Sequence, residues 1–508
     1  MMARSGLHQT FAVHSACLRG VEAFPVTVEV SSSGGIPGTT IVGMADSAVL
    51  EARSRIRCAI RSSGFEVPRL SFTVSLSPGD MRKTGTGFDL AIAVAILALS
   101  GQIPISGVDG CLFAGELALD GRVLGVRGEV AFQILSRAER LRFVSGRYDR
   151  HISMEDVDQV ELGVLGGLRG GIARLPLTPS TRCNARPEIA MLDYEDVVGQ
   201  EFAKRALMIA AAGGLGMLMI GPPGSGKTML ARRMTSILPP IDQMELEQAL
   251  CIHSVMGEPA DKLLSGIRPF RNPHHAASSA GLIGGGRPVL PGEISLAHGG
   301  VLYLDELGEF QNSVLQMLRQ PLEDGEVRLV RVDGTYVFPA RFQLLAASNP
   351  CPCGYLGDRE IACRCSETAV QHYQQRLGGP LIDRIDVVVD VGRLDPSTIV
   401  SGASGASSRD LKEQVLRGRE FASWRCRKKC ESGSLRSGLD SSVAAYDLED
   451  SASEALIELA RRKRLTARGI TRLCRIARTI ADVDERALVT TDNLLEASML
   501  QGRRNERT

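Results

Sequence analysis

The pattern of apolar and polar positions first separates an amino-terminal region of mixed character. Residues 8–174 alternate strand-like pieces, such as Pro25–Val30 and Leu70–Leu76, with helical pieces such as Ser47–Ser62. Short runs with a period of two indicate strands, and apolar positions three or four residues apart indicate amphipathic helices. The pattern therefore predicts an α/β domain over residues 1–174.

Two stretches without periodicity predict the remaining boundaries. The first is Pro-rich and predicts an exposed linker over residues 175–187. Short buried-strand runs then return over residues 188–395 and predict a second domain. The Ser/Gly/Ala stretch Ser401–Ser408 has the composition of a flexible linker, so the second linker is placed at residues 396–408.

Helical periodicity dominates the carboxyl-terminal region, residues 409–508, and predicts a small helical lid. Ser and Thr are favoured at helix N-caps because their side chains accept hydrogen bonds from the first free amides. The predicted helices are Ser453 to Arg464 with Ser453 as the cap, Ala467–Ala481 after Thr466, and Asp492–Gly502 after Thr491.

Composition limits the compartment and the partners. The 508 residues include 59 Lys plus Arg and 58 Asp plus Glu, so the net charge of +1 allows only local contacts with a polyanion. The longest apolar run, Leu90–Leu99, is about half of the ~20 residues that span a bilayer, and it predicts a buried helix. Twelve cysteines without a secretory signal suggest reduced thiols. We therefore predict a cytoplasmic protein without a membrane segment.

A phosphate-binding loop is predicted between a buried strand, Met217–Ile220, and a helix. Glycines let backbone N–H groups surround phosphates, Lys227 reaches the outer phosphates, and Thr228 binds magnesium. A glycine-rich turn before an ordinary helix is the alternative, which the strand, loop and helix together disfavour. ATP and Mg²⁺ are the predicted ligands, and the predicted loop residues are Gly221, Pro222, Pro223, Gly224, Ser225, Gly226, Lys227, Thr228 and Met229.

Two further strand ends carry polar groups that suit hydrolysis. Val301–Leu304 ends in Asp305 and Glu306, which predicts Asp305 near the magnesium and Glu306 as the group that polarises the attacking water. Two carboxylates after four apolar residues would be costly without a cation, which favours catalysis over a helix cap. Leu344–Ser348 ends in Asn349, whose amide is predicted to orient the water.

Arg384 has two interpretations that the sequence leaves open. It stands between Asp383 and Asp386, where a local ion pair is one reading of the pattern. The other is an arginine finger that acts on the ATP of a neighbouring subunit.

The motifs together resemble those of the AAA+ superfamily. Their exact residues are similar to those of the Mg-chelatase-like ComM/YifB family over nearly the whole chain. The resemblance implies a P-loop AAA+ parallel-sheet core over residues 188–395, followed by the helical lid. The strings that carry it are Asp196–Glu201, Arg268–His275, Gly284–Gly286, Gly292–Gly300 and Asn349–Cys353.

The resemblance also implies roles and an assembly. Val198 and Gln200 would flank the adenine, and Asn349 would be the sensor 1 residue. Arg384 would be the arginine finger, and Arg468 would be the sensor 2 residue of the lid. Members of the family form hexameric rings, so the chain is expected to bind copies of itself.

The amino-terminal domain resembles the Lon-protease-like α/β fold through Asp80–Asp89 and Gly115–Val123. The Lon pattern needs a serine about where Gly87 stands and a lysine about where Val130 stands, and neither residue supplies a nucleophile or a base. We therefore predict a non-proteolytic domain. A weak alternative nucleophile and base are Ser77 and Lys83.

Four cysteines follow the third strand end in two close pairs. A tetrahedral thiolate site for Zn²⁺ is one interpretation, and it would fix the loop after Asn349. Because the C-x-C spacing is tighter than the usual C-x-x-C, four reduced thiols in a loop remain the alternative. The cysteines are Cys351, Cys353, Cys363 and Cys365.

Three features with basic residues bear on nucleic-acid or metal binding. A hairpin with an Asp333-Gly334 turn would carry Arg328 and Arg331. The resemblance to AAA+ rings, in which a hairpin at this place faces the central pore, implies contact of these arginines with DNA phosphates, and a solvated hairpin with charged edges is the alternative. Adjacent histidines point apart in an extended strand, so His274–His275 predicts no metal site. The basic residues around Trp424 have two interpretations, nucleic-acid binding or an exposed face of an amphipathic helix, and we assign neither. They are Arg425, Arg427, Lys428 and Lys429.

Three functions are compatible with these motifs. The family resemblance implies a hexameric DNA translocase that drives branch migration of single-stranded or branched DNA in recombination or natural transformation. A chelatase-type motor for metal insertion is disfavoured, because that subunit lacks a Lon-like domain. A nucleotide-gated scaffold is disfavoured by the intact set of Lys227, Asp305, Glu306 and Asn349.

Overall fold

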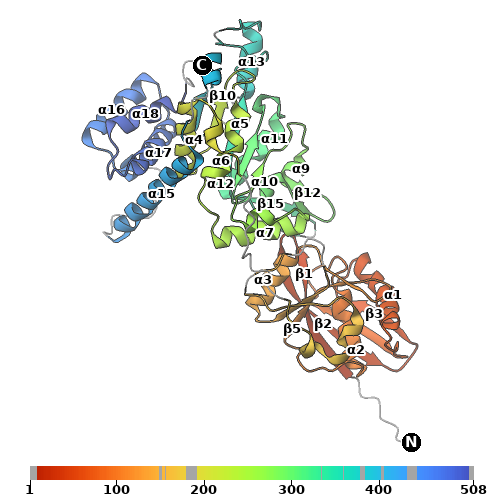
Figure 1. The fold of residues 1–508 in the computed structure, drawn as a ribbon. Helices are drawn as coiled ribbons and strands as arrows, with labels where there is room; N and C mark the ends of the chain where they lie inside the picture. The colour runs from red at the N-terminus through yellow and green to blue at the C-terminus, as the bar shows by residue number, and fades with distance from the viewer. Residues whose placement is uncertain are drawn as a thin grey trace, which may run out of the picture.

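The computed structural model shows a mixed amino-terminal domain, a parallel-sheet core and a carboxyl-terminal helical region, which confirms the predicted fold class (Figure 1). Among the described residues, no helix is both long and apolar enough to cross a membrane. The structure describes residues 9–147, 152–154, 156–178, 191–332, 334–358, 360–377, 381, 384–401, 405–431 and 443–502.

A seven-stranded mixed sheet forms the amino-terminal domain, in the order β3-β4-β2-β1-β5-β8-β9. The buried helix α2 confirms the prediction made from the run Leu90–Leu99. Asp46 caps α1 by accepting a hydrogen bond from the Val49 amide. The strands are β1 (Gln9–Arg19), β2 (Glu22–Ser33), β3 (Gly38–Val42), β4 (Ser71–Ser77), β5 (Cys111–Phe113), β8 (Arg142–Ser145) and β9 (Gln159–Glu161), with the small pair β6 (Glu116–Leu117) and β7 (Val123–Leu124). The helices are α1 (Ser47–Ser62), α2 (Asp89–Leu99) and α3 (Glu129–Ala138), with 3-10 turns at Leu165–Gly170 and Ile172–Arg174.

Five parallel strands form the sheet of the core, in the order β11-β14-β17-β10-β18. These strands are β10 (Met217–Ile220), β11 (Phe270–Arg271), β14 (Val301–Leu304), β17 (Gln343–Ser348) and β18 (Val387–Asp390). Two hairpins project from the core, β12 (Gly284–Gly285) with β13 (Leu290–Pro291) and β15 (Glu326–Arg331) with β16 (Gly334–Pro339). The helices are α4 (Glu201–Gly213), α5 (Lys227–Arg232), α6 (Met234–Ile237), α7 (Gln243–Met256), α8 (Asp261–Leu264), α9 (Ser279–Ile283), α10 (Glu293–Leu296), α11 (Asn312–Met317), α12 (Arg319–Asp324) and α13 (Glu367–Leu377), with 3-10 turns at Tyr194–Asp196 and Leu307–Glu309.

The helical region shares a hydrophobic core with one face of the sheet. Leu207 of α4, Leu345 of β17 and Ile476 of α17 are buried in one cluster. The buried Ser408 fixes the start of α15, because its hydroxyl accepts from the Tyr194 amide. The helices are α14 (Pro396–Ser401), within the stretch predicted as a linker, then α15 (Ser408–Glu431), α16 (Asp450–Arg462), α17 (Ala467–Val483) and α18 (Thr491–Met499), with a 3-10 turn at Val443–Tyr446.

Helix starts in this region show where capping patterns succeed and fail. Thr466 caps α17 as predicted, by accepting from the Gly469 amide. The prediction for Ser453 is wrong, because α16 begins at Asp450, which lets both Ala452 and Leu456 face the core. The cap of α18 is Thr490 rather than Thr491, since only Thr490 can exchange hydrogen bonds with Asn493 in a capping box.

The amino-terminal domain packs against the core through α3 and α7 (Figure 1). Val130 and Val255 are buried in one cluster with Phe338 of β16. Arg137 of α3 forms an ion pair with Glu247 of α7 at 2.7 Å. The interface therefore combines an apolar centre with a charged contact at its side.

Candidate nucleotide site

Three strand ends meet at the carboxyl edge of the core sheet. Ile220 of β10 lies in register with Ser348 of β17, and Leu304 of β14 lies in register with Ala346 of the same strand. The segments that follow these strands are therefore neighbours at one edge. Parallel α/β sheets bind ligands at this edge, beyond the carboxyl ends of their strands.

The phosphate loop begins where β10 ends and runs into α5. Gly226 has a left-handed backbone with φ of 89° and precedes the first helical residue, Lys227. A side chain at Gly221 would overlap the Val391 carbonyl, so glycine is required there. The Lys227 ammonium donates to the carbonyls of Gly221 and Pro222 at 2.7 and 2.8 Å. Burial lowers the pKa of Lys227, while Asp305 and Glu306 act in the opposite direction.

Thr228 and Asp305 are in direct contact across the site. The Thr228 hydroxyl donates to Asp305 Oδ2 at 2.8 Å, and the Tyr303 hydroxyl lies 3.4 Å from Thr228 Oγ1. The Thr228 hydroxyl and the Asp305 carboxylate both offer hard oxygen atoms, which Mg²⁺ prefers as ligands. The structure thus brings together the two residues predicted to bind the metal.

Glu306 stands beside this pair in a left-handed conformation, with φ of 52° and ψ of 50°. Such a backbone is uncommon for a residue with a side chain and clusters at functional sites. The Glu306 side chain is 56% exposed, so its carboxylate is accessible to solvent water. Asn349 follows β17 at the same edge and is half-buried.

His275 is a neighbour of Glu306 that the sequence did not reveal. Its Nδ1 lies 3.6 Å from Glu306 Oε2, and its ring meets the ring of Phe310 edge to face. The rings of His274 and His275 lie 4.1 Å apart, so the expectation that they point apart is wrong. That expectation assumed an extended strand, whereas His274 begins a turn in which its carbonyl accepts from the Ala277 amide.

Gln200 connects the phosphate loop to the segment after β18. Its side-chain amide donates to the Gly392 carbonyl at 2.8 Å and to the Ser225 carbonyl at 3.4 Å. Val198 is half-buried two residues before it, and Met229 is exposed on the first turn of α5. Of the two residues expected to flank the adenine, Gln200 therefore contacts the phosphate loop.

The two arginines predicted to act on ATP lie in other surroundings. Arg384 forms an ion pair with Glu323 of α12 rather than with Asp386. Asp386 is paired with Arg475 at 3.2 Å, and Asp383 lies outside the described residues. Arg468 is exposed in the first turn of α17. Both roles stay predictions.

Comparison with known proteins adds the family. The sequence model described as magnesium chelatase, subunit ChlI, matches residues 193–399, and the model of its C-terminal part matches residues 405–501. A third model, subunit ChlI of Mg-chelatase, matches residues 28–144. The chain is 40% identical over 507 residues to YifB of Escherichia coli K12 and 37% identical over 498 residues to competence protein ComM of Haemophilus influenzae. Both alignments cover 96% of each chain.

This chain belongs to the YifB/ComM family. The finding confirms the resemblance seen in the motifs and makes the protein a Mg-chelatase-like AAA+ ATPase. The chain is also 32% identical to a magnesium-chelatase 67 kDa subunit of Chlorobaculum parvum over 201 residues, which are 39% of this chain and 26% of that one. The YifB/ComM relatives thus match the whole architecture, and that chelatase subunit matches a part.

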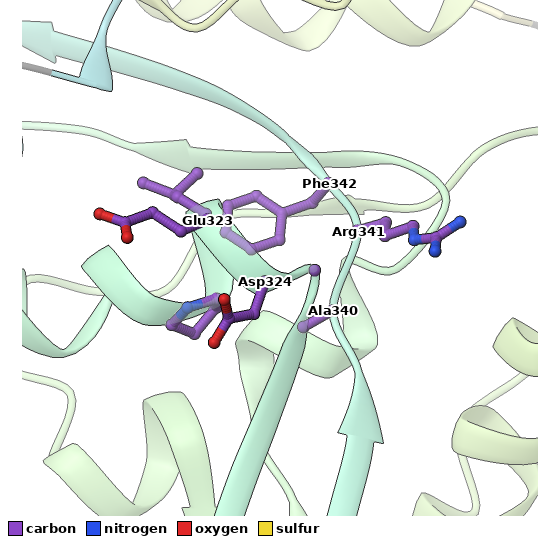
Figure 2. Close-up of a pocket in the computed structure, with 8 residues that line it drawn as sticks. Glu323, Asp324, Ala340, Arg341 and Phe342 are labelled. Carbon is purple, nitrogen blue, oxygen red and sulfur yellow. The ribbon is translucent and has the colours of Figure 1, made fainter. Parts of the chain in front are cut away.

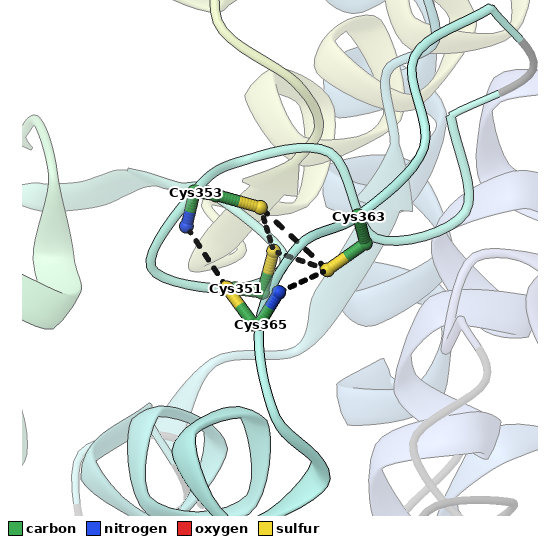
Figure 3. Close-up of side chains that lie close together, drawn as sticks. All are labelled: Cys351, Cys353, Cys363 and Cys365. Atoms are coloured by element: carbon green, nitrogen blue, oxygen red, sulfur yellow. Dashed lines mark hydrogen bonds between the residues drawn. The ribbon is translucent and has the colours of Figure 1, made fainter.

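The four cysteines of this YifB/ComM chain converge on one point (Figure 3). Their sulfur atoms all lie within 4.8 Å of one another. The pKa of Cys353 is lowered, because the amides of Tyr355 and Arg364 donate to its sulfur. Burial raises the pKa of Cys351 to about 12, so the close approach of the four sulfur atoms, rather than the thiol pKa values, is what suits a metal. The cluster is compatible with zinc.

The predicted hairpin is confirmed as β15 and β16, while Asp333 of its turn lies outside the described residues. Strand β16 lies against the amino-terminal domain, where the Arg19 guanidinium lies over the Tyr336 ring and donates to the Thr335 carbonyl at 3.4 Å. Near the tip, a Cβ built at Gly285 would lie 3.2 Å from Arg331 Nη2, so the two hairpins are adjacent.

A surface pocket of about 380 Å³ lies at the base of β15 (Figure 2). Glu323 and Arg341 are among the residues that line it, and the phosphate loop does not contribute to its lining.

The basic residues around Trp424 and the alternative base Lys83 are both engaged in contacts within the protein. Around Trp424, Arg425 forms an ion pair with Asp482 at 3.0 Å and Lys429 pairs with Asp447, so these two charges are partly neutralised. In the amino-terminal domain, Lys83 is fully buried and donates to the Pro78 carbonyl.

Proposed function

We propose that this chain is one protomer of an ATP-driven ring motor that moves DNA. The contact between Thr228 and Asp305, with Glu306 next to it, carries the proposal. A bound nucleotide needs only the phosphate loop, but turnover also needs a metal ligand and a group that activates water. All three groups stand at one sheet edge.

In this proposal each residue has a distinct task. The amides of the loop Gly221–Thr228 bind the phosphates, and Lys227 turns from its backbone carbonyls to the outer phosphates. Thr228 and Asp305 would hold Mg²⁺, which neutralises charge on the phosphates when bound. Glu306 accepts the proton of the attacking water, and Asn349 orients that water.

In an assembled ring, Arg384 and Arg468 would have roles at the nucleotide site. Arg384 would leave Glu323 and reach the ATP of a neighbouring subunit, which requires an oligomer, and a hexameric ring is the proposed form. Arg468 would approach the phosphates from the lid. Because the lid shares a hydrophobic core with α4, a movement of the lid would also displace α4.

DNA is the proposed track. Arg331 of β15 and Arg287, near the end of β12, are exposed on adjacent hairpins and offer phosphate contacts without base selection. A relative 37% identical to this chain is named competence protein, which supports a role in natural transformation or recombination. Branched or single-stranded DNA would be the substrate, and branch migration the activity.

Two cofactor and compartment assignments complete the proposal. Besides Mg²⁺, the four-cysteine cluster would hold Zn²⁺. The eleven cysteines among the described residues are free thiols. Reduced thiols suit the cytoplasm.

ATPase and strand-displacement assays test the proposed track. Turnover should rise in the presence of single-stranded or forked DNA, and Arg331→Ala should abolish most of this stimulation without changing turnover in its absence. Arg57→Ala, which removes an exposed charge from α1, is the matched control. Turnover that is indifferent to DNA, with no strand displacement or junction migration, would refute the track.

A further inference from the structure

We infer that a Zn²⁺ ion on the four cysteines holds the phosphate loop in its binding conformation. The inference rests on the proposed nucleotide site and adds a metal-dependent control to it. Three observations support it: the spacing of the sulfur atoms, the contact of the cysteine loop with Pro223, and a second contact near Gln200.

The sulfur spacing matches a tetrahedral metal site. Cys351 Sγ lies 3.4 Å from Cys353 Sγ and 3.7 Å from Cys363 Sγ, and Cys353 Sγ lies 3.6 Å from Cys363 Sγ. With Cys365 included, all four sulfur atoms lie within 4.8 Å of one another. A tetrahedron with Zn–S bonds of about 2.3 Å has edges of roughly 3.8 Å. A disulfide would bring two sulfurs to about 2.05 Å. The spacing therefore favours four thiolates around one ion.

Backbone amides complete the environment of the sulfurs. The Cys353 amide donates to Cys365 Sγ at 3.4 Å, and the Cys365 amide donates to Cys363 Sγ at the same distance (Figure 3). Such donors stabilise negative charge on sulfur, and they orient the ligands as outer partners do in metal sites. Both sulfur atoms of the second cysteine pair thus accept a backbone hydrogen bond from within the cluster.

The same loop touches the phosphate loop directly. Gly354 follows Cys353 and has φ of 86°. A Cβ built at Gly354 would lie 2.6 Å from Pro223 Cδ and 3.8 Å from Asn349 Cγ. No side chain separates the cysteine loop from these two residues, so a displacement of one loop moves the other.

A second contact reaches the other end of the nucleotide site. The Arg393 guanidinium lies 5.5 Å from the centroid of the Tyr355 ring and pairs with Asp358 at 3.5 Å. Its neighbour Gly392 accepts the hydrogen bond from Gln200. The loop between the cysteine pairs therefore contacts the nucleotide site at two places. It contacts Pro223 directly, and it contacts the segment whose Gly392 carbonyl accepts from Gln200.

The metal content of the full-length protein is the first test. Protein purified under reducing conditions should contain about one zinc per chain, in line with a four-thiolate site. Cys363→Ser should lower the zinc content, and Cys58→Ser, at an exposed cysteine on α1, should not. A wild-type protein that binds nucleotide but takes up no zinc would overturn the inference.

Nucleotide affinity is the second test, measured with a fluorescent ADP analogue. Removal of zinc by a chelator should weaken binding by roughly tenfold, within the usual range of coupling between sites. Unchanged affinity after loss of zinc would overturn the coupling. Absence of nucleotide binding in zinc-loaded protein would instead refute the proposed nucleotide site.

Two glycine variants separate coupling from misfolding. Gly354→Ala keeps all four cysteines, so zinc content should be unchanged while nucleotide affinity falls, because the methyl group pushes on Pro223. Gly357→Ala is the matched control, since its φ is 79° and a Cβ there meets no atom within 4 Å. Equal affinities of the two variants would contradict the proposed contact.

Discussion

The Thr228 hydroxyl donates to Asp305 Oδ2 at 2.8 Å, although 77 positions separate the two residues in the chain. The contact exists because β10 and β14 both pair with β17 in parallel, which aligns the segments after their ends. With Mg²⁺ bound, the same two oxygens are placed to share the ion. The pair therefore marks the point where the phosphate loop and the acidic strand end become one site.

Glu306→Gln should separate nucleotide binding from turnover. The amide keeps the size of the side chain but cannot accept a proton, so the rate should fall by about 10²–10⁴-fold. Affinity for ATP should stay unchanged, measured by a fluorescent analogue. Glu309→Gln, at an exposed position three residues further on, is the control and should turn over normally. Full activity of Glu306→Gln would remove Glu306 from the mechanism.

His275→Ala should lower kcat with little change in KM. His275 is a positioning residue, since its Nδ1 lies 3.6 Å from the Glu306 carboxylate and Phe310 packs against its ring. Loss of this restraint on Glu306 should cost roughly tenfold in rate. His372→Ala, at an exposed histidine on α13, serves as the control. A change in KM alone would indicate that His275 contacts the nucleotide instead.

Mixing experiments should decide the role of Arg384. If it completes the site of a neighbour, inactive Arg384→Ala and inactive Lys227→Ala subunits should recover part of the ATPase rate when mixed. Recovery requires that some interfaces combine an intact phosphate loop with an intact arginine. Glu323→Gln removes only the ion-pair partner and should retain activity. If Glu323→Gln is as inactive as Arg384→Ala and mixing restores nothing, the ion pair is structural.

Acid should destabilise the core partly through His298. Its Nδ1 accepts from the Arg341 amide, and burial lowers its pKa from 6.5 to about 4. The folded state therefore keeps the ring neutral while the unfolded state binds a proton. Stability that is present above pH 6.5 should be lost as the pH falls toward 4, by roughly 3 kcal/mol at most.

His298→Asn tests this pH dependence, because its amide oxygen can replace Nδ1 as the acceptor for Arg341. Denaturant unfolding between pH 7 and pH 4 should show a flatter decline in the variant than in the wild type. His372→Asn, at an exposed position, should leave the slope unchanged. Parallel curves for the wild type and His298→Asn would show that His298 does not titrate on unfolding.

Local patterns predicted the elements that local interactions decide. The helix Ala467–Val483 begins after Thr466 because the cap bonds lie within one turn, and α2 is buried because its residues are almost all apolar. Ser453 failed as a cap because the start of α16 depends on which residues meet the core. A cap pattern contains no information about that distant surface.

The sequence by itself determined that this YifB/ComM chain has a phosphate loop, an acidic strand end and four cysteines. Each of these is a local string whose chemistry follows from its residue types. Only the tertiary structure decided that His275 lies beside Glu306, that Arg384 pairs with Glu323, and that Gly354 lies against Pro223. These contacts join segments far apart in the chain, and they depend on strand register and helix packing, which no short string specifies.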